Sequence, residues 1–241
     1  MIVKVYESKE AIGTAAASLF AACVIMKPRA VLGLATGSTP IPTYQRMIEL
    51  YRADAVDFSG VTTFNLDEYV GLSREHEQSY YAFMMEQLFQ HINVSPSHIH
   101  VLSGKTADPA VECRAYEEMI AAAGGIDLQI LGIGRNGHIA FNEPSDSFSP
   151  VTHVVDLTES TIEANTRFFS SVDEVPRQAL TMGIGSIMKA KSIVLIATGR
   201  DKAQAVKAMV DGPVTPLCPA SVLQLHPCVT VMLDQAAASL L

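Results

Sequence analysis

The stretch AVLGLATGSTPIPTYQRMIELY, residues 30–51, decides the fold class. Residues 30–35 form a short and nearly continuous apolar run, which is typical of a parallel strand covered on both faces. Small and polar residues follow at 36–40, and apolar side chains then recur at helical spacing over 41–51. A strand, a tight turn and a helix in this order form the repeating unit of an α/β protein.

The same alternation continues along the whole chain. It predicts strands at 2–6, 30–35, 61–66, 98–102, 126–132, 151–157, 192–197 and 229–233. It predicts helices at 11–26, 41–51, 81–89, 109–123, 161–169, 201–209 and 220–225. Neither a Pro-, Gly- or Ser-rich linker nor an internal repeat divides the sequence. We therefore expect a single domain over residues 1–241, with a doubly wound, mostly parallel sheet and helices on both of its faces.

The composition excludes several classes of function. Apolar residues make up 49% of the 241 residues, and 25 acidic residues against 17 basic ones give a formal charge of −8. This balance disfavours an extended surface for nucleic acid or for an anionic membrane, although a few local donors could still hold a small anion. The four cysteines show no spacing typical of zinc, so we expect reduced thiols and no metal.

The apolar segment 11–26 has two interpretations. It is too short to span a bilayer, which takes roughly 20 apolar residues, and acidic residues interrupt the basic leader that a signal peptide would have. An amphipathic helix is the better interpretation, because an apolar stripe recurs at alternating spacings of four and three. The stripe comprises Ile12, Ala16, Leu19, Cys23 and Met26. We expect a cytoplasmic protein.

The loops that follow the strands hold the residues capable of chemistry, because ligands of open parallel sheets bind beyond the carboxyl ends of the strands. In the first loop, the backbone around Gly37 and the hydroxyls of Ser38 and Thr39 could hold a phosphate at a helix start. Without a Walker lysine or a GxGxxG pattern, a tight turn with an N-cap is the more frequent meaning of such a loop.

The second loop carries two adjacent carboxylates, Asp67 and Glu68. A carboxylate at the end of a strand is well placed as a general base, and its basicity rises in a dry pocket or beside a second carboxylate. The alternative is structural: Asp67 would cap the next segment and Glu68 would be solvated. For an isolated Asp-Glu pair, that alternative is the more frequent one.

The third loop, residues 131–144, turns at several glycines, including Gly137, and presents His138 with Asn136 and Glu143 nearby in the sequence. This grouping suits a proton-transferring histidine whose tautomer and charge are set by polar neighbours. Further along the chain, Arg167 and Lys202 lie near the ends of predicted elements. Each could bind phosphate or be an ordinary surface charge.

These segments resemble a known family. The runs LGLATGSTP, FNLDEYVG, LGIGRNGHIAFNEP, NTRFF, ATGRDKA and LQLHP resemble, in this order, the glucosamine-6-phosphate deaminases, and the resemblance extends from residue 31 to residue 227. It implies a Rossmann-like sheet, no cofactor, and conversion of glucosamine 6-phosphate and water into fructose 6-phosphate and ammonia. The DEYVG and GHIAFNEP runs are its most specific parts.

The resemblance also implies a role for each matching residue. Asp67 would move the C2 proton of the open-chain sugar to C1 through an enolamine, and His138 would open the ring. Glu143 would orient and charge His138. Asn136 stands where many relatives carry aspartate, and an amide can orient an imidazole but cannot stabilise its charge. The implied substrate-binding residues are Gly37, Ser38, Thr39, Gly137, Arg167 and Lys202.

Two other functions remain open at this point. A related 6-phosphogluconolactonase would hydrolyse a lactone and would need no base for C2, whereas Asp67 within DEYVG favours the deaminase. A non-catalytic sugar-phosphate sensor would tend to lose the acid and base residues and to carry a basic N-terminal module, and this chain opens with a predicted strand instead. It keeps Asp67, His138 and Glu143 together.

The resemblance gives two further expectations. Hexameric relatives continue beyond the last strand, whereas this chain stops at Leu241, so we expect a monomer or a small homo-oligomer. Several bacterial relatives are activated by N-acetylglucosamine 6-phosphate, which they hold with serines, an arginine and a lysine after the AFNEP run. The corresponding stretch here, residues 145–156, has no Arg or Lys, so we expect a non-allosteric enzyme.

Overall fold

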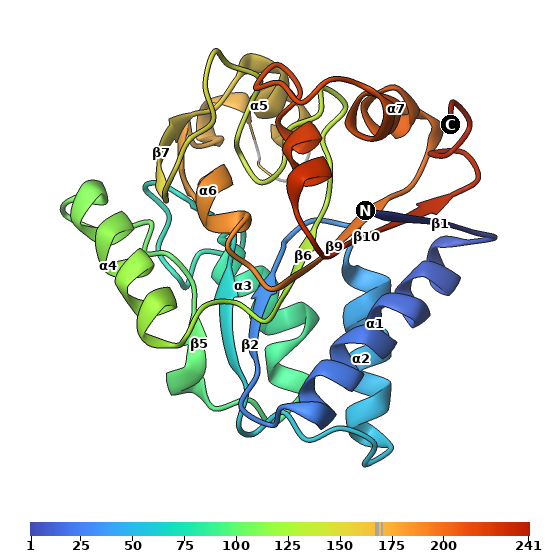
Figure 1. The fold of residues 1–241 in the computed structure, drawn as a ribbon. Helices are drawn as coiled ribbons and strands as arrows, with labels where there is room; N and C mark the ends of the chain where they lie inside the picture. The colour runs from blue at the N-terminus through green and yellow to red at the C-terminus, as the bar shows by residue number, and fades with distance from the viewer. Residues whose placement is uncertain (167–168, 170) are drawn as a thin grey trace.

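The computed structural model describes residues 1–166, 169 and 171–241. Its main sheet has seven parallel strands in the order β1-β10-β9-β6-β2-β3-β5 (Figure 1). They are β1 (Ile2–Tyr6), β2 (Val31–Leu34), β3 (Thr62–Asn65), β5 (Ile99–His100), β6 (Leu128–Leu131), β9 (Ser192–Ala197) and β10 (Val229–Asp234). All seven were predicted as strands, and the fold class is confirmed.

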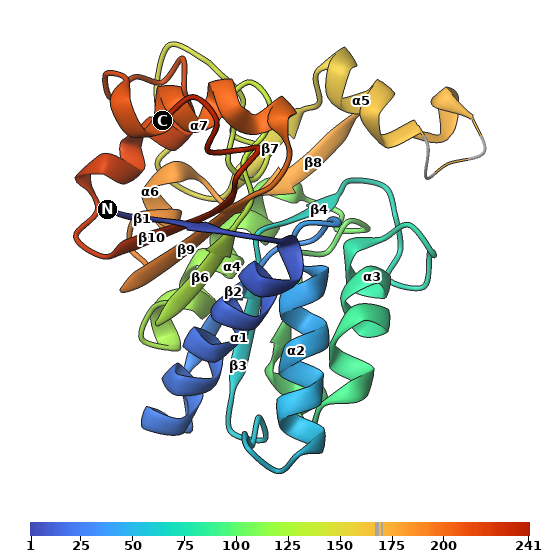
Figure 2. The same cartoon turned by 90° about the vertical axis from the view of Figure 1, so that its right-hand side faces the viewer.

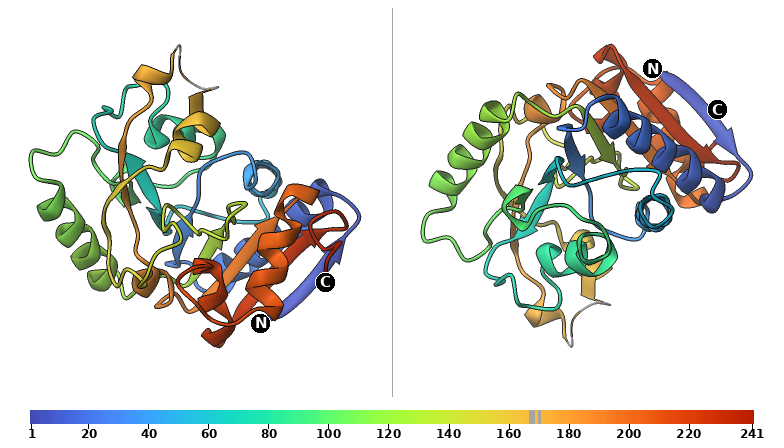
Figure 3. Two further views of the ribbon diagram at one scale, coloured as in Figure 1. Left: turned by 90° about the horizontal axis from the view of Figure 1, so that it is seen from above. Right: turned by 90° about the horizontal axis from the view of Figure 1, so that it is seen from below.

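Helices cover both faces of this sheet. Figure 2 shows α1 (Lys9–Met26), α2 (Ile41–Arg52) and α3 (Tyr80–Gln87) side by side on one face. In the view from above in Figure 3, the green helix α4 (Pro109–Ala122) lies on the opposite side of the sheet from α2 and α3. The remaining α-helices are α5 (Glu159–Asn165), α6 (Ile184–Ile187) and α7 (Ala203–Asp211).

The strand order reverses between β2 and β6. From β2 the chain adds β3 and then β5 on one side, returns through α4 to β6, and adds β9 and β10 on the other side. The loops that leave β2 and β6 at their carboxyl ends therefore diverge at the place where open α/β sheets bind ligands. The turn at 36–40 and the loop after Leu131 both begin there.

A second sheet of three antiparallel strands departs from the sequence prediction. Its order is β4 (Asp67–Tyr69), β8 (Gln178–Thr181) and β7 (His153–Asp156), and only β7 was predicted as a strand. The stretches that form β4 and β8 are three and four residues long, too short to show a period of two. Tyr69 and Ala179 belong to a small hydrophobic cluster of their own, together with Phe141, Leu157, Ile162 and Val175.

The predicted buried stripe of α1 is partly wrong. Ile12 and Ala16 are buried, but Leu19 is 39% exposed, Cys23 is partly exposed and Met26 is 86% exposed. The helix is apolar on every side, so its sequence pattern does not select one face. The buried face follows a spacing of four instead, with Phe20 and Val24 in place of the expected residues.

By length and composition α1 could also cross a membrane. In the fold it packs against α2 and β10, as a core helix of a globular protein does, and seven of its residues are buried.

Three predicted helices differ in extent or type. The helix expected at 161–169 begins earlier, at Glu159, because Thr158 caps its N-terminus, and it ends at Asn165. Residues 220–225 form part of a 3₁₀ helix (Pro219–Leu225). A further 3₁₀ turn, Arg200–Lys202, precedes α7, where the helix was expected from residue 201.

Candidate active site

The four loops singled out in the sequence follow, or lie close behind, four neighbouring strands. In the sheet order β9-β6-β2-β3, these strands are followed by Lys202, by the loop at 132–144, by the turn at 36–40 and by Asp67. Because the strands are parallel, their carboxyl ends meet at one edge of the sheet. Segments that are more than 160 residues apart in the chain are thus brought to the same edge.

His138 and Glu143 form the tightest pair at this edge. Nδ1 of His138 lies 3.0 Å from Oε1 of Glu143. The other oxygen of Glu143 accepts a hydrogen bond from the amide of Asn136. The hydroxyl of Thr161, on α5, donates to Oε1 over 3.0 Å. Burial alone would raise the pKa of the Glu143 carboxyl, but His138, Asn136 and Thr161 outweigh it and hold the pKa below its ordinary value.

Asn136 acts on this pair differently from the expectation. Its amide oxygen accepts a hydrogen bond from the main-chain N–H of His138 over 3.2 Å, and its amide nitrogen donates to Glu143. The side chain therefore orients the carboxylate and the loop rather than the imidazole. A second carboxylate at this position would face the charge of Glu143, whereas an amide supplies a donor.

The loop that carries His138 depends on two glycines. A Cβ on Gly134 would lie 2.4 Å from the imidazole, so only glycine lets the ring pack against the backbone there. Gly137 has φ of +87°, and its own N–H and C=O groups bond to Gly134 and Ala220. In the structure, Gly137 therefore shapes the loop.

The return of the chain from His138 to Glu143 strains one residue. Ala140 has φ of +50°, a left-handed conformation that costs a non-glycine residue on the order of 1 kcal/mol. Asn142 holds the turn in place, because its amide donates to the carbonyls of Ile139 and Met182 over 3.0 and 2.9 Å. The main-chain N–H of Phe141 donates to Oγ1 of Thr181, on β8.

Asp67 lies two residues after the end of β3 as the first residue of β4, and it is 7% exposed. Its backbone pairs with Thr181, the same residue that supports Phe141. Among the residues that the structure describes, none donates a hydrogen bond to its carboxylate. Burial, and secondarily the charge of Glu68, raise the pKa of Asp67 to about 8. A carboxylic acid with such a pKa can exchange a proton near neutral pH.

The structure contradicts the structural alternative for Asp67 and Glu68. That alternative made Asp67 the cap of the next segment, whereas the capping residue is Glu68. Successive residues of a strand point to opposite faces, so Glu68 turns away from Asp67 and is 2% exposed. Its carboxylate accepts N–H groups at the start of α3 from Tyr80 and Tyr81, over 2.9 and 3.0 Å, and a third from Tyr69. Glu68, which was expected to be solvated, is the capping residue.

The phosphate-binding residues proposed from the sequence lie in two described places. Ser38 and Gly37 are exposed and Thr39 is partly buried, just before α2, whose N-terminus no side chain caps. Lys202 is partly buried, and burial lowers its pKa although Asp201 opposes the effect. Arg167 lies outside the described residues.

Some contributors to this edge gave no signal in the sequence. Arg135 pairs with Asp201 over 2.9 Å and so joins the loop after β6 to the loop after β9. Thr161 and Thr181 are threonines in ordinary contexts, and only the contact partners single them out. Within the described residues, no group of three His, Cys, Asp or Glu side chains gathers as a metal site would.

The family is shown by sequence. A profile of the family described as Glucosamine-6-phosphate isomerases/6-phosphogluconolactonase matches residues 7–232. The chain belongs to this family. It is similar to the glucosamine-6-phosphate deaminase of Thermoanaerobacter pseudethanolicus, with 59% identity over 89% of this chain and 85% of that protein. The protein of the same name from Alkaliphilus oremlandii is 53% identical over 100% of both chains.

Solved structures of the family agree with the fold. A monomeric glucosamine-6-phosphate deaminase superimposes with a TM-score of 0.97 at 46% identity, covering 100% of both chains. The 6-phosphogluconolactonase from Leishmania guyanensis gives a TM-score of 0.76 at 22% identity over 98% of this chain and 97% of that one, which shows a shared fold alone. The family resemblance stated from the sequence is confirmed.

The effect of the Glu68 charge on the pKa of Asp67 can be tested by mutation. Replacing Glu68 by Gln removes a buried negative charge, so the pKa of Asp67 should fall below its present value of about 8. It also replaces charge-assisted hydrogen bonds to α3, which should cost about 1–3 kcal/mol of unfolding free energy. Carbon-13 NMR titration of the Asp67 carboxyl and urea unfolding measure the two effects.

The matched control is Glu112→Gln, which removes another carboxylate that accepts a main-chain N–H, that of Ser103. It should leave the titration midpoint of Asp67 in place. An unchanged midpoint in Glu68→Gln would show that Glu68 does not tune its neighbour.

Proposed function

We propose that this chain is a glucosamine-6-phosphate deaminase, which converts glucosamine 6-phosphate and water into fructose 6-phosphate and ammonia. The observation that carries the proposal is the combination of two acid-base groups beyond the parallel strands β6 and β3, which flank β2. One is His138, paired with an ionised Glu143, and the other is the buried Asp67. Relatives at 52–59% identity bear this name.

Ring opening is assigned to His138. With Nδ1 held by Glu143, the neutral imidazole carries its proton on Nδ1 and leaves Nε2 as the acceptor. Nε2 takes the proton of the C1 hydroxyl and delivers it to the ring oxygen. The negative charge of Glu143 stabilises the imidazolium that forms between these two transfers. Asn136 holds the carboxylate in place.

The isomerisation is assigned to Asp67. Its carboxylate removes the C2 proton of the open-chain sugar and returns it to C1, so that an enolamine forms between the two transfers. Water then replaces nitrogen at C2 and ammonia leaves. A base with a pKa of about 8 releases and accepts a proton near neutral pH with little driving force lost in either direction.

The phosphate of the substrate is assigned to the turn at Gly37, Ser38 and Thr39, together with Arg167 and Lys202. The uncapped start of α2 offers main-chain N–H groups to an anion, and Lys202 adds a charge from the loop after β9. A dianion is held best by hydrogen bonds and charges together.

Two alternative functions fit the site less well. A lactone hydrolase needs an activated water but no proton acceptor for C2, so a buried carboxylate with a raised pKa beyond β3 would have no task. A non-catalytic sugar-phosphate sensor would need neither Asp67 nor the pairing of His138 with Glu143.

We also propose the organisation expected from the sequence. Residues 1–241 act as a single domain, supported by the pairing of β1 with β10, strands from the two ends of the chain. The protein works in the cytoplasm as a monomer or a small homo-oligomer and needs no cofactor. The similar structure of a monomeric deaminase supports the monomer.

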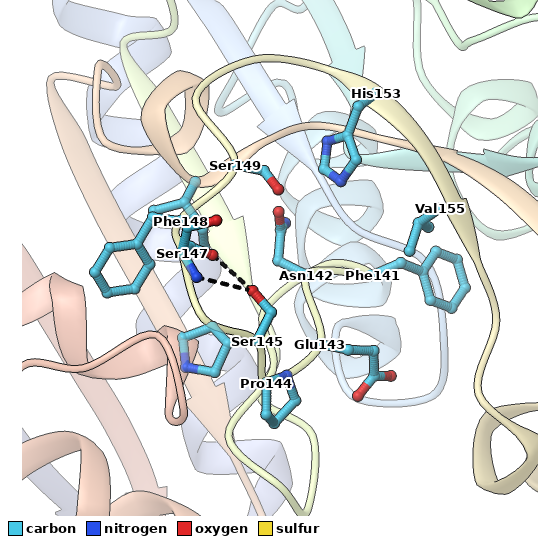
Figure 4. Close-up of a pocket in the computed structure, with 12 residues that line it drawn as sticks. Phe141, Asn142, Glu143, Pro144, Ser145, Ser147, Phe148, Ser149, His153 and Val155 are labelled. Atoms are coloured by element: carbon cyan, nitrogen blue, oxygen red, sulfur yellow. Dashed lines mark hydrogen bonds between the residues drawn. The ribbon is translucent and has the colours of Figure 1, made fainter.

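The enzyme is proposed to be non-allosteric, on the evidence of one pocket. A cavity of about 150 Å³ is lined by Ser145, Ser147, Phe148, Ser149 and His153, together with residues of the AFNEP run (Figure 4). No Arg or Lys is among its twelve described lining residues. A phosphorylated effector would meet no compensating cation there, and coupling requires an effector that binds two states differently.

The acid-base roles can be separated by two mutants. With purified protein and glucosamine 6-phosphate, ammonia release should fall on the order of 10²- to 10⁴-fold in Asp67→Asn, as for the loss of a general base. His138→Gln should slow ring opening, a step that the sugar also makes slowly in solution. Exchange of the C2 hydrogen with solvent should therefore vanish in Asp67→Asn and persist weakly in His138→Gln. Equal residual exchange would reverse the two roles.

Arg167→Ala and Lys202→Ala test the phosphate site. Each should lower kcat/KM for glucosamine 6-phosphate far more than for unphosphorylated glucosamine, because a charge-assisted contact to phosphate is lost. Lys207→Ala, which breaks an exposed pair with Asp211 on α7, is the control. If both substrates lose activity by the same factor, neither residue binds phosphate.

The proposed absence of allosteric regulation can be tested by steady-state kinetics. The dependence of rate on glucosamine 6-phosphate should be hyperbolic, and N-acetylglucosamine 6-phosphate should change it only by weak competition at the active site. Steady-state rates with and without this compound decide the matter. A sigmoidal curve that the compound makes hyperbolic would contradict the inference drawn from the missing cations.

A further inference from the structure

A threonine outside the acid-base residues touches the carboxylate on which His138 depends. Thr161 lies on α5, and its hydroxyl lies 3.0 Å from Oε1 of Glu143. The same oxygen lies 3.0 Å from Nδ1 of His138. The single oxygen atom that faces the imidazole is therefore also the one that α5 reaches.

The chemistry of the groups fixes the direction of each hydrogen bond. An ionised carboxylate only accepts, so the one proton of the Thr161 hydroxyl points to Glu143. The hydroxyl of Thr158 in turn donates to that of Thr161 over 3.0 Å. Thr158 is the N-cap of α5, and its hydroxyl accepts the main-chain N–H of Thr161 over 3.3 Å. The start of the helix thus sets both the position and the proton of Thr161.

Packing holds α5 in the place from which Thr161 can do this. Ile162, the next residue, is 4% exposed and belongs to the same small cluster as Phe141 and Tyr69. Phe141 lies between Ala140 and Asn142, in the turn that returns the chain to Glu143. Helix and turn are therefore packed into one unit, with the hydroxyl and the carboxylate facing each other across it.

We propose that Thr161 is a positioning residue that keeps Glu143 ionised and aimed at His138, so that ring opening requires α5 to be folded. Asn136 holds one carboxylate oxygen and Thr161 the other, and together they fix the plane of the carboxylate. Without Thr161, the oxygen facing the imidazole loses the hydroxyl that donates to it, and the carboxylate can rotate. The proposal rests on the ring-opening role of the His138–Glu143 pair.

A purely structural role would leave a different pattern. Threonine hydroxyls in helices commonly bond to a main-chain carbonyl one turn back, as that of Thr166 does with Ile162 over 2.9 Å. Thr161 uses its proton on a side chain from another element instead. Valine has the same shape and a similar helix propensity, so the change Thr161→Val removes the donor with little effect on α5 itself.

The test compares Thr161→Val with Thr161→Ser, which keeps the hydroxyl, and with Thr161→Ala as a second variant without it. In Thr161→Val, kcat for ammonia release should fall about 10- to 150-fold, the usual scale for one hydrogen bond to a charged group. Thr161→Ser should recover most of it. Thr106→Val, at the start of α4, is the matched control and should keep full activity, because that hydroxyl bonds only to main-chain groups.

Two further measurements separate positioning from general damage. The inhibition constant of 2-amino-2-deoxyglucitol 6-phosphate, an acyclic analogue that needs no ring opening, should stay unchanged in Thr161→Val. The carbon-13 NMR titration midpoint of the Glu143 carboxyl should move to higher pH in Thr161→Val and Thr161→Ala and return in Thr161→Ser. This titration needs no activity, so it tests Thr161 even where the proposed function fails.

Wild-type kcat in Thr161→Val, an unmoved Glu143 titration, or weakened binding of the acyclic analogue by the same factor as kcat would each overturn the proposal. If the wild-type protein releases no ammonia while the titration still moves, the proposed reaction fails and the positioning of Glu143 stands.

Discussion

The backbone of Thr181, at the end of β8, joins the two halves of the site. It pairs with Asp67 on one side and with His153 on the other. Its hydroxyl accepts the N–H of Phe141, in the turn between His138 and Glu143. One residue therefore sets the position of the proposed C2 base relative to the proposed ring-opening pair. The main sheet brings the loops to a common edge, but this small sheet fixes their mutual register.

The cost of the site lies in the two carboxylates that it buries. Asp67 has a pKa of about 8 in the fold against an ordinary value of 3.8. The folded state therefore binds this proton more tightly than the unfolded chain, and the stabilisation that the proton gives is lost as pH rises through 8. The start of α3 compensates the burial of Glu68 only in part, because desolvation still raises its pKa, while Asp67 is left without a described donor. That asymmetry separates the proposed general base from the capping carboxylate.

The sequence contains enough information for the main sheet, but not for the small one. Strands such as β2 and β9 are continuous apolar runs, because both of their faces are covered. The strand β4 reads Asp-Glu-Tyr, and its extended form depends on a partner, β8, more than 100 residues later. Pairing of this kind is decided by tertiary contacts and leaves no periodic pattern.

The site residues show the same division. His138, Glu143 and Asp67 could be predicted as candidate site residues because they lie in loops after buried strands, and because their runs resemble those of a family. The sequence does not show which member of the pair Asp67 and Glu68 caps a helix. Whether Asp67 or Glu68 caps α3 depends on which face of β4 each one occupies, and a register shift of one residue would exchange them.

The strain at Ala140 shows why the loop after β6 is built as it is. Glu143 must return to His138 within five residues, and a regular turn or strand would carry it away from the imidazole. The left-handed residue makes that return, and the amide of Asn142 holds it through the carbonyl of Ile139 within the turn and that of Met182 beyond β8. A conformational cost on the order of 1 kcal/mol is thus offset by these hydrogen bonds. The same turn exposes Glu143 to α5, so the geometry that forms the acid-base pair also makes it dependent on Thr161.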